Sequence, residues 1–115
     1  MLKEAKRNLT KAMIMNPNKF TIYNSLGAVL GDIGNYPAAV QTLRIGIKLN
    51  PANASGYYNL GIVYEKAKEY DSAVKSLEMA LKLKHKNSEA IKKKIEELKI
   101  LLVENPKFNY KFGVG

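Results

Sequence analysis

The sequence of 115 residues contains no cysteine and a single histidine, His85. Disulfide bonds and thiolate chemistry are therefore excluded. A zinc site would need three carboxylates around His85, and no short spacing of Asp or Glu supplies them. We predict no metal and no cofactor. A chain without cysteine suits a reducing compartment, so we expect it to be cytoplasmic or the cytoplasmic-facing part of a longer protein.

Long apolar runs are also missing. A membrane-spanning helix needs about 20 consecutive apolar residues, and the uncharged stretches of this sequence are shorter. A secretory signal would need an apolar segment near the start, where Lys3, Glu4, Lys6 and Arg7 stand instead. The sequence therefore predicts no membrane span.

Acidic residues are scarce, with 10 against 19 basic ones and a net charge of +9. Such an excess can attract nucleic acid, an anionic membrane or an acidic protein. The densest group of lysines extends from Lys82 to Lys94 and contains one acid, Glu89. We interpret this group as a solvated face at the end of a helical stack.

Catalytic patterns are missing as well. Ser72 and Lys75 have the Ser-x-x-Lys spacing of serine acylases, but no companion motif follows. Gly27, Gly31 and Gly34 do not follow a predicted strand, so they do not indicate a phosphate-binding loop. We therefore predict that the protein is not an enzyme.

One unit of the sequence occurs twice. Asn16-Pro17 recurs 34 residues later as Asn50-Pro51, and residues 20–53 align with residues 54–87 without a gap. This self-similarity indicates a duplicated structural unit. The identical positions are Tyr23/Tyr57, Leu26/Leu60, Gly27/Gly61, Val29/Val63, Tyr36/Tyr70, Ala39/Ala73, Val40/Val74, Leu43/Leu77, Lys48/Lys82, Leu49/Leu83 and Asn53/Asn87.

Each unit is predicted to be a helical hairpin. Apolar residues recur every three or four positions in 20–33 and again in 36–49, which is the spacing of one helix face. Gly34 and Pro37 separate the two helices, because glycine commonly ends a helix and proline commonly begins one. Asn50 precedes proline and therefore avoids the helical region, which ends the unit.

The period and the positions of small and aromatic residues resemble the tetratricopeptide repeat. The first unit carries the signature as Tyr23, Leu26, Gly27, Leu30, Ala39, Leu43, Gly46 and Pro51. The second unit carries it as Tyr57, Leu60, Gly61, Tyr64, Ala73, Leu77 and Ala80, with His85 in place of the proline. The resemblance implies an all-α fold, a right-handed superhelix of stacked helical hairpins.

We expect a repeat domain over residues 1–104. Residues 1–15 are predicted to be the second helix of a truncated repeat, since Ala5, Leu9 and Ala12 stand 34 residues before Ala39, Leu43 and Gly46. Residues 20–53 and 54–87 are the complete repeats. The chain thus begins within a repeat, so we expect a fragment of a longer protein or a neighbouring subunit on the open face.

Residues 88–104 are predicted to be a capping helix that Asn87 and Ser88 begin. Its apolar stripe faces the preceding hairpin, and its charged residues, Lys94 among them, are expected to face water. Residues 100–103 are apolar on every side, so we expect another segment to cover them. The stripe consists of Ile91, Ile95, Leu98 and Leu102.

Residues 105–115 leave the helical period and are predicted to form an extended or docked C-terminal tail. Phe108, Tyr110 and Phe112 alternate with polar residues, which suits a strand or a segment laid along a groove. A frayed terminus with incidental aromatics is the alternative. If the tail docks, these aromatics are candidates for self-association.

The resemblance also implies a function: a non-catalytic scaffold that binds a partner peptide or protein segment in a concave groove lined by the first helix of each repeat. An aromatic, an amide and an aliphatic side chain on adjacent turns can hold a peptide side chain and its backbone. The candidate groove residues are Asn24, Ala28, Tyr58, Asn59, Ile62, Lys66 and Lys93.

Some members of the resembling family hold a C-terminal carboxylate with lysines and asparagines. Asn59 and Lys93 match two of these residues, whereas Asn24 and Ala28 replace a lysine and an asparagine. Glu89 replaces another lysine and brings negative charge into the pocket. We therefore do not expect an acidic C-terminal motif to be the ligand.

Two other functions compete with this one. A homo-oligomeric assembly module would use the open N-terminal face and the aromatic tail. RNA binding is the third, because residues 21–26 and 46–51 also resemble pentatricopeptide repeats, which read one base per repeat. The period of 34, the Leu-Gly pair and the Ala-x3-Leu spacing favour protein binding.

Overall fold

The structure, a computed structural model, describes residues 1–105. This part of the chain contains six α-helices and no strand. The tail residues Phe108, Tyr110 and Phe112 lie outside it. The helices are α1 (Leu2–Met15), α2 (Phe20–Ile33), α3 (Tyr36–Leu49), α4 (Ala54–Lys66), α5 (Tyr70–Lys82) and α6 (Ser88–Glu104).

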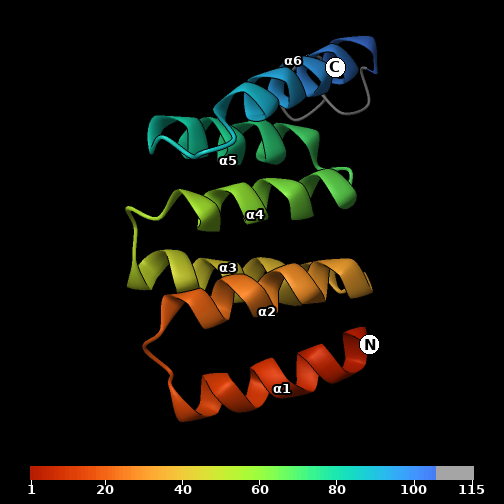
Figure 1. Ribbon diagram of the computed structural model, residues 1–115. Helices are drawn as coiled ribbons and strands as arrows, with labels where there is room; N and C mark the ends of the chain where they lie inside the picture. The colour runs from red at the N-terminus through yellow and green to blue at the C-terminus, as the bar shows by residue number, and fades with distance from the viewer. Residues whose placement is uncertain (106–115) are drawn as a thin grey trace.

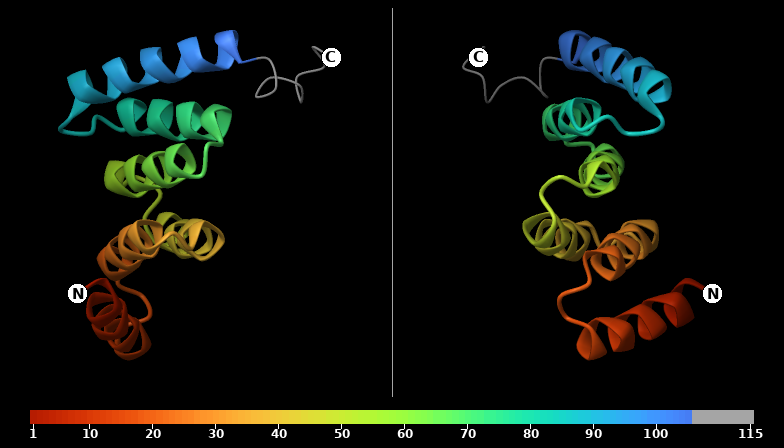
Figure 2. Two further views of the ribbon diagram at one scale, coloured as in Figure 1. Left: turned by 90° about the vertical axis from the view of Figure 1, so that its right-hand side faces the viewer. Right: turned by 60° about the vertical axis from the view of Figure 1, so that its left-hand side comes forward.

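The helices form a single stack of hairpins (Figure 1). α2 pairs with α3 and α4 pairs with α5, while α1 and α6 stand at the two ends of the stack (Figure 2). The molecule is accordingly elongated, with principal extents of 47 × 27 × 24 Å. The all-α fold of stacked helical hairpins predicted from the sequence is confirmed.

Both hairpins close at a glycine that faces a leucine. A Cβ built on Gly61 would lie 2.7 Å from Cγ of Leu77, and a Cβ on Gly27 would overlap the side chain of Leu43 in the same way. Leu43 and Leu77 have no exposed surface, so neither can move aside. The two repeats of the sequence therefore share the same glycine–leucine contact between their helices. Such a contact is expected for a helix pair that needs a small residue where its helices meet.

The turn within the first hairpin has the predicted chemistry. Gly34 ends α2 with φ of 99°, and the side chain of Asn35 accepts a hydrogen bond from the N–H of Ala38 at 3.4 Å. In the second hairpin the equivalent of Gly34 is Lys68, which adopts φ of 63°. A non-glycine residue rarely occupies this region, so the second turn stores some backbone strain.

α6 docks as the sequence predicts, through Ile91, Ile95 and Leu98, which are all buried. Its start differs in detail: the side chain of Asn87 makes no cap bond, and Ser88 Oγ donates to the carbonyl of His85 at 2.6 Å. At its other end, Ile100 and Val103 remain 54% and 77% exposed. The described residues therefore do not cover this apolar end.

α1 is the least embedded helix. It has no buried residue and packs on α2 through partly buried side chains that include Leu9 and Met13. Ile14 and Met15 at its C-terminal end are 71% and 79% exposed. Within residues 1–105, none of the helices has the length and apolar character that crossing a membrane requires.

Candidate peptide-binding surface

The candidate site lies on the first helix of each hairpin and on the last helix, α6. We call it the first-helix surface: the face shared by α2, α4 and α6. α4 is its centre, because side-chain contacts join α4 to α2 on one side and to α6 on the other. The sequence-predicted residues on it are Asn24, Ala28, Tyr58, Asn59, Ile62, Lys66 and Lys93.

Asn24 does not fit the prediction of a groove contact, because it is only 9% exposed. Its Nδ2 donates to Oδ1 of Asn53 at 3.0 Å, and that same oxygen accepts the N–H of Gly56 at the start of α4. Asn24 therefore joins the first hairpin to the cap of the next one. The spacing that places it on the groove side of α2 is correct for a helix, but the neighbouring hairpin covers that position.

Asn59 also contacts the preceding hairpin. Its Nδ2 donates to the backbone carbonyl of Asn24 at 3.4 Å, a long hydrogen bond, and the residue remains partly exposed. Ala28 and Ile62 are partly buried on the same two helices. An amide with a weak internal contact and a nearby aliphatic side chain remain accessible to a ligand.

Tyr58 stacks on His85, which stands in the turn between α5 and α6. The ring centroids are 4.7 Å apart and the planes meet at 23°. His85 is 7% exposed, and its Nδ1 accepts the N–H of Asn87 at 3.0 Å. Burial first, and the charge of Lys86 second, lower the pKa of His85. The imidazole thus covers one face of the Tyr58 ring, and the residue remains partly exposed.

Two ion pairs cross the first-helix surface. Lys66 pairs with Asp32 of α2 at 2.6 Å, and Lys94 of α6 pairs with Glu65 at 3.0 Å. The hydrogen bond to Glu65 is the main cause that raises the pKa of Lys94, against an opposing effect of burial. The expectation that Lys94 faces only water is therefore wrong, because the rotation of α6 brings it beside α4.

Lys93 keeps the exposure that the sequence predicts. Within residues 1–105 it forms no ion pair, unlike its neighbours Lys92 and Lys94. Glu89 pairs with Lys92 at 3.4 Å on the outside of α6. Among the described residues, Lys93 is thus the lysine of this surface that forms no ion pair. It lies in the first half of α6, which follows the turn where His85 stacks on Tyr58.

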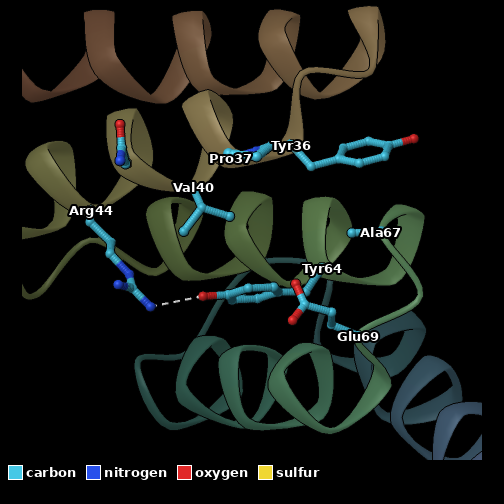
Figure 3. Close-up of a pocket in the computed structure, with 8 residues that line it drawn as sticks. Tyr36, Pro37, Val40, Arg44, Tyr64, Ala67 and Glu69 are labelled. Carbon is cyan, nitrogen blue, oxygen red and sulfur yellow. Dashed lines mark hydrogen bonds between the residues drawn. The ribbon is translucent and has the colours of Figure 1, made fainter. Parts of the chain in front are cut away.

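A hollow on the other side of the stack was not predicted. It has a volume of about 550 Å³ and lies between α3, the end of α4 and the turn that follows it (Figure 3). Arg44 donates to the hydroxyl of Tyr64 at 2.9 Å, and Glu69 lies at the opposite end of the Tyr64 ring (Figure 3). Sequence spacing gave no signal for it, because it forms between one hairpin and the next. Its lining residues are Tyr36, Pro37, Val40, Gln41, Arg44, Tyr64, Ala67 and Glu69.

Comparison with known families agrees with this architecture. A family model described as TPR repeat matches residues 30–68, and one described as tetratricopeptide repeat matches residues 54–87. The chain belongs to the tetratricopeptide-repeat family. Membership supports a protein-interaction scaffold. Among curated protein sequences, none matches significantly.

Several solved structures, TPR domains among them, have a fold similar to most of this chain. The first TPR of Spaghetti (RPAP3), bound to the HSP90 peptide SRMEEVD, is 18% identical with a TM-score of 0.82, covering 89% of this chain and 80% of its own. The first TPR domain of human RPAP3 is 17% identical with a TM-score of 0.84, covering 92% and 83%. MamA protein is 27% identical with a TM-score of 0.75, covering 96% and 62%.

Proposed function

We propose that this protein is a non-catalytic scaffold that binds a segment of another protein on the first-helix surface, in the concave groove that such helices form in the family. One observation carries the proposal. Tyr58, Asn59 and Ile62 occupy adjacent turns of the central helix, and each is partly exposed although the helix is packed on both sides. This arrangement offers a ring, an amide and an aliphatic contact without reorganisation of the fold.

The charge on this surface indicates which class of peptide it suits. Asp32 and Glu65 are each paired with a lysine, so each of these two ion pairs has no net charge. Within residues 1–105, Lys93 is the candidate lysine of this surface that forms no ion pair, and one such charge is a weak basis for holding several carboxylates. We therefore propose a ligand with apolar side chains and at most one acidic group near Lys93.

The proposed ligand differs from the peptide that is bound to the structurally similar RPAP3 domain. The RPAP3 domain binds the acidic peptide SRMEEVD. Here Asn24 is buried against Asn53, and Glu89 stands outside with its own partner, Lys92. We propose that neither can contribute to a clamp for an acidic C-terminus.

The test begins with peptides selected from a random phage-displayed library on the immobilised protein. Binding of the best peptide is then measured by isothermal calorimetry to the wild type and to the variant Tyr58→Ala. We expect a loss of about 1–3 kcal/mol, the usual range for an aromatic contact at an interface. Tyr57→Ala is the matched control, because Tyr57 is the adjacent tyrosine of α4 and, like Tyr58, is partly buried against the core.

Circular dichroism must show that both variants remain folded. An unchanged affinity of Tyr58→Ala for every selected peptide would move the site away from α4. A loss that is equal in the two variants would indicate general destabilisation and would also count against the proposed surface.

Self-association is the second candidate. Exposed apolar side chains stand at both ends of the stack: Ile14 and Met15 on α1, and Ile100 and Val103 on α6. Exposed apolar surface of this kind commonly marks an interface. Light scattering coupled to size exclusion, with and without residues 105–115, tests it. A monomer in both forms at high concentration would remove this candidate.

A further inference from the structure

A row of cations follows one face of α1. Lys3, Arg7 and Lys11 follow one another at four-residue spacing, Lys6 lies three residues after Lys3, and all four are exposed. With Thr10 they border a hollow of about 450 Å³. We call these five residues the α1 stripe. Residues three and four apart are neighbours on a helix, so the four charges lie together over roughly 12 Å.

None of these cations is neutralised by the rest of the described chain. Within residues 1–105, the ion pairs use Lys66, Lys92, Lys94 and Lys99, and none uses the stripe. The hydroxyl of Thr10 is engaged locally, donating to the carbonyl of Lys6 at 2.7 Å. Four like charges at this spacing repel one another, so the stripe weakens α1 unless an anion joins it.

The repeat shows that the stripe is an outer surface and not a place for another helix. The residues 34 positions later on α3 are Pro37, Val40, Gln41, Arg44 and Ile45, and all but Val40 are exposed. The positions of α1 that match the hairpin contact of α3 are Ala5, Leu9 and Ala12 instead. A helix packed against α1 in the manner of α2 against α3 would therefore leave the stripe open.

From these observations we infer that the α1 stripe binds an acidic segment of a partner protein, at a site separate from the first-helix surface. The charge selects a partner rich in Asp and Glu. Ile14 lies on the same face, eleven residues after Lys3, and is 71% exposed. An apolar side chain of a protein segment can cover Ile14, whereas a phosphate backbone has no group that gains from that contact. This favours an acidic amphipathic segment over nucleic acid.

The probe is a fluorescein-labelled helical peptide of about four turns, with Glu on one face and Leu at one end, measured by anisotropy at about 0.15 M salt. The stripe variant is Lys3→Gln, Lys6→Gln and Lys11→Gln together. The matched control is Lys75→Gln, Lys82→Gln and Lys86→Gln, three exposed lysines elsewhere. Both lower the net charge by three, and Gln has nearly the helix propensity of Lys.

We expect the stripe variant to weaken binding about tenfold or more and the control to weaken it by less than about threefold. Ile14→Ser should also weaken binding, and Tyr58→Ala should not, so this result does not depend on the proposed groove. An equal loss of peptide affinity in the stripe and control variants would show that binding depends on net charge alone, and would overturn the inference. So would undetectable peptide binding, or stripe-dependent binding to duplex RNA or to phosphatidylserine vesicles that is tighter than binding to the peptide.

Discussion

The ring of Tyr58 stacks on the ring of His85 at 4.7 Å, and this contact connects the central helix α4 to the turn before α6. His85 holds that turn with both its side chain and its backbone: Nδ1 accepts the N–H of Asn87, and the carbonyl accepts Ser88 Oγ. The stack therefore couples a residue of the proposed binding surface to the start of the last helix. The predictions below follow from this contact and from three others.

The first prediction concerns pH. The pKa of His85 is lowered in the fold from its ordinary value of 6.5, so the unfolded chain binds this proton more readily. The stability linked to neutral His85 is fully present above about pH 6.5 and is lost as the pH falls through that value toward the folded pKa. Urea unfolding between pH 7.5 and pH 5.5 should show a falling midpoint. Because the sequence has one histidine, His85→Gln should flatten this dependence. A slope that is the same in both proteins would contradict the assignment.

The second prediction concerns the hairpin contact. Gly61→Ala would place its Cβ 2.7 Å from Leu77 Cγ, in a core with no free space. Overpacking of this kind costs about 1–3 kcal/mol, against about 1 kcal/mol gained from better helix propensity. We expect a net loss in the free energy of unfolding by urea. Ser55→Ala, an exposed change on the same helix, is the control.

A double variant sharpens the test of that contact. Leu77→Ala alone should cost about 2–5 kcal/mol, because it leaves a cavity. Gly61→Ala combined with Leu77→Ala should cost less than the sum of the two, since the new methyl group partly fills that cavity. Strict additivity would show that the two positions do not touch.

The third prediction concerns Asn53, whose Oδ1 accepts hydrogen bonds from Gly56 N–H at 3.1 Å and from Asn24 Nδ2 at 3.0 Å. Asn53→Ala removes a helix cap, worth about 1 kcal/mol, and leaves a buried amide without its acceptor, worth about 1–3 kcal/mol more. Asn35→Ala removes a single cap bond on α3 and should cost about 1 kcal/mol or less. Asn53→Asp keeps the oxygen that accepts both hydrogen bonds and should restore most of the loss. Thermal unfolding of the three variants decides, and equal effects at positions 35 and 53 would refute the role of Asn24.

The fourth prediction compares two adjacent lysines. Lys94 pairs with Glu65 across helices and is partly buried, whereas Lys93 is exposed and unpaired within residues 1–105. Lys94→Met should lower the free energy of unfolding by up to about 1 kcal/mol, the usual limit for a pair open to solvent. Lys93→Met should leave it unchanged and instead alter peptide affinity. The hydrogen-exchange rate of the α6 amides should increase only in the Lys94 variant. The opposite result would show that Lys93 stabilises α6 and that Lys94 does not.

The sequence by itself determined the helices and their pairing. Apolar residues at three- and four-residue spacing, the breaks at Gly34 and Asn50-Pro51, and the alignment of residues 20–53 with residues 54–87 all follow from local geometry repeated with a fixed period. Backbone hydrogen bonding in a helix is short-range, so spacing along the chain is enough to predict it.

Only the tertiary structure decided what happens between hairpins. The burial of Asn24 under Asn53 at the start of α4, the pairing of Lys94 with Glu65 and the hollow beside Arg44 join one hairpin to the next element of the stack, and the stack of Tyr58 on His85 joins α4 to the turn before α6. The physical reason is that these contacts depend on how far each hairpin turns relative to the one before. That rotation results from packing of whole surfaces, and a difference of one helical position moves a side chain from solvent into an interface.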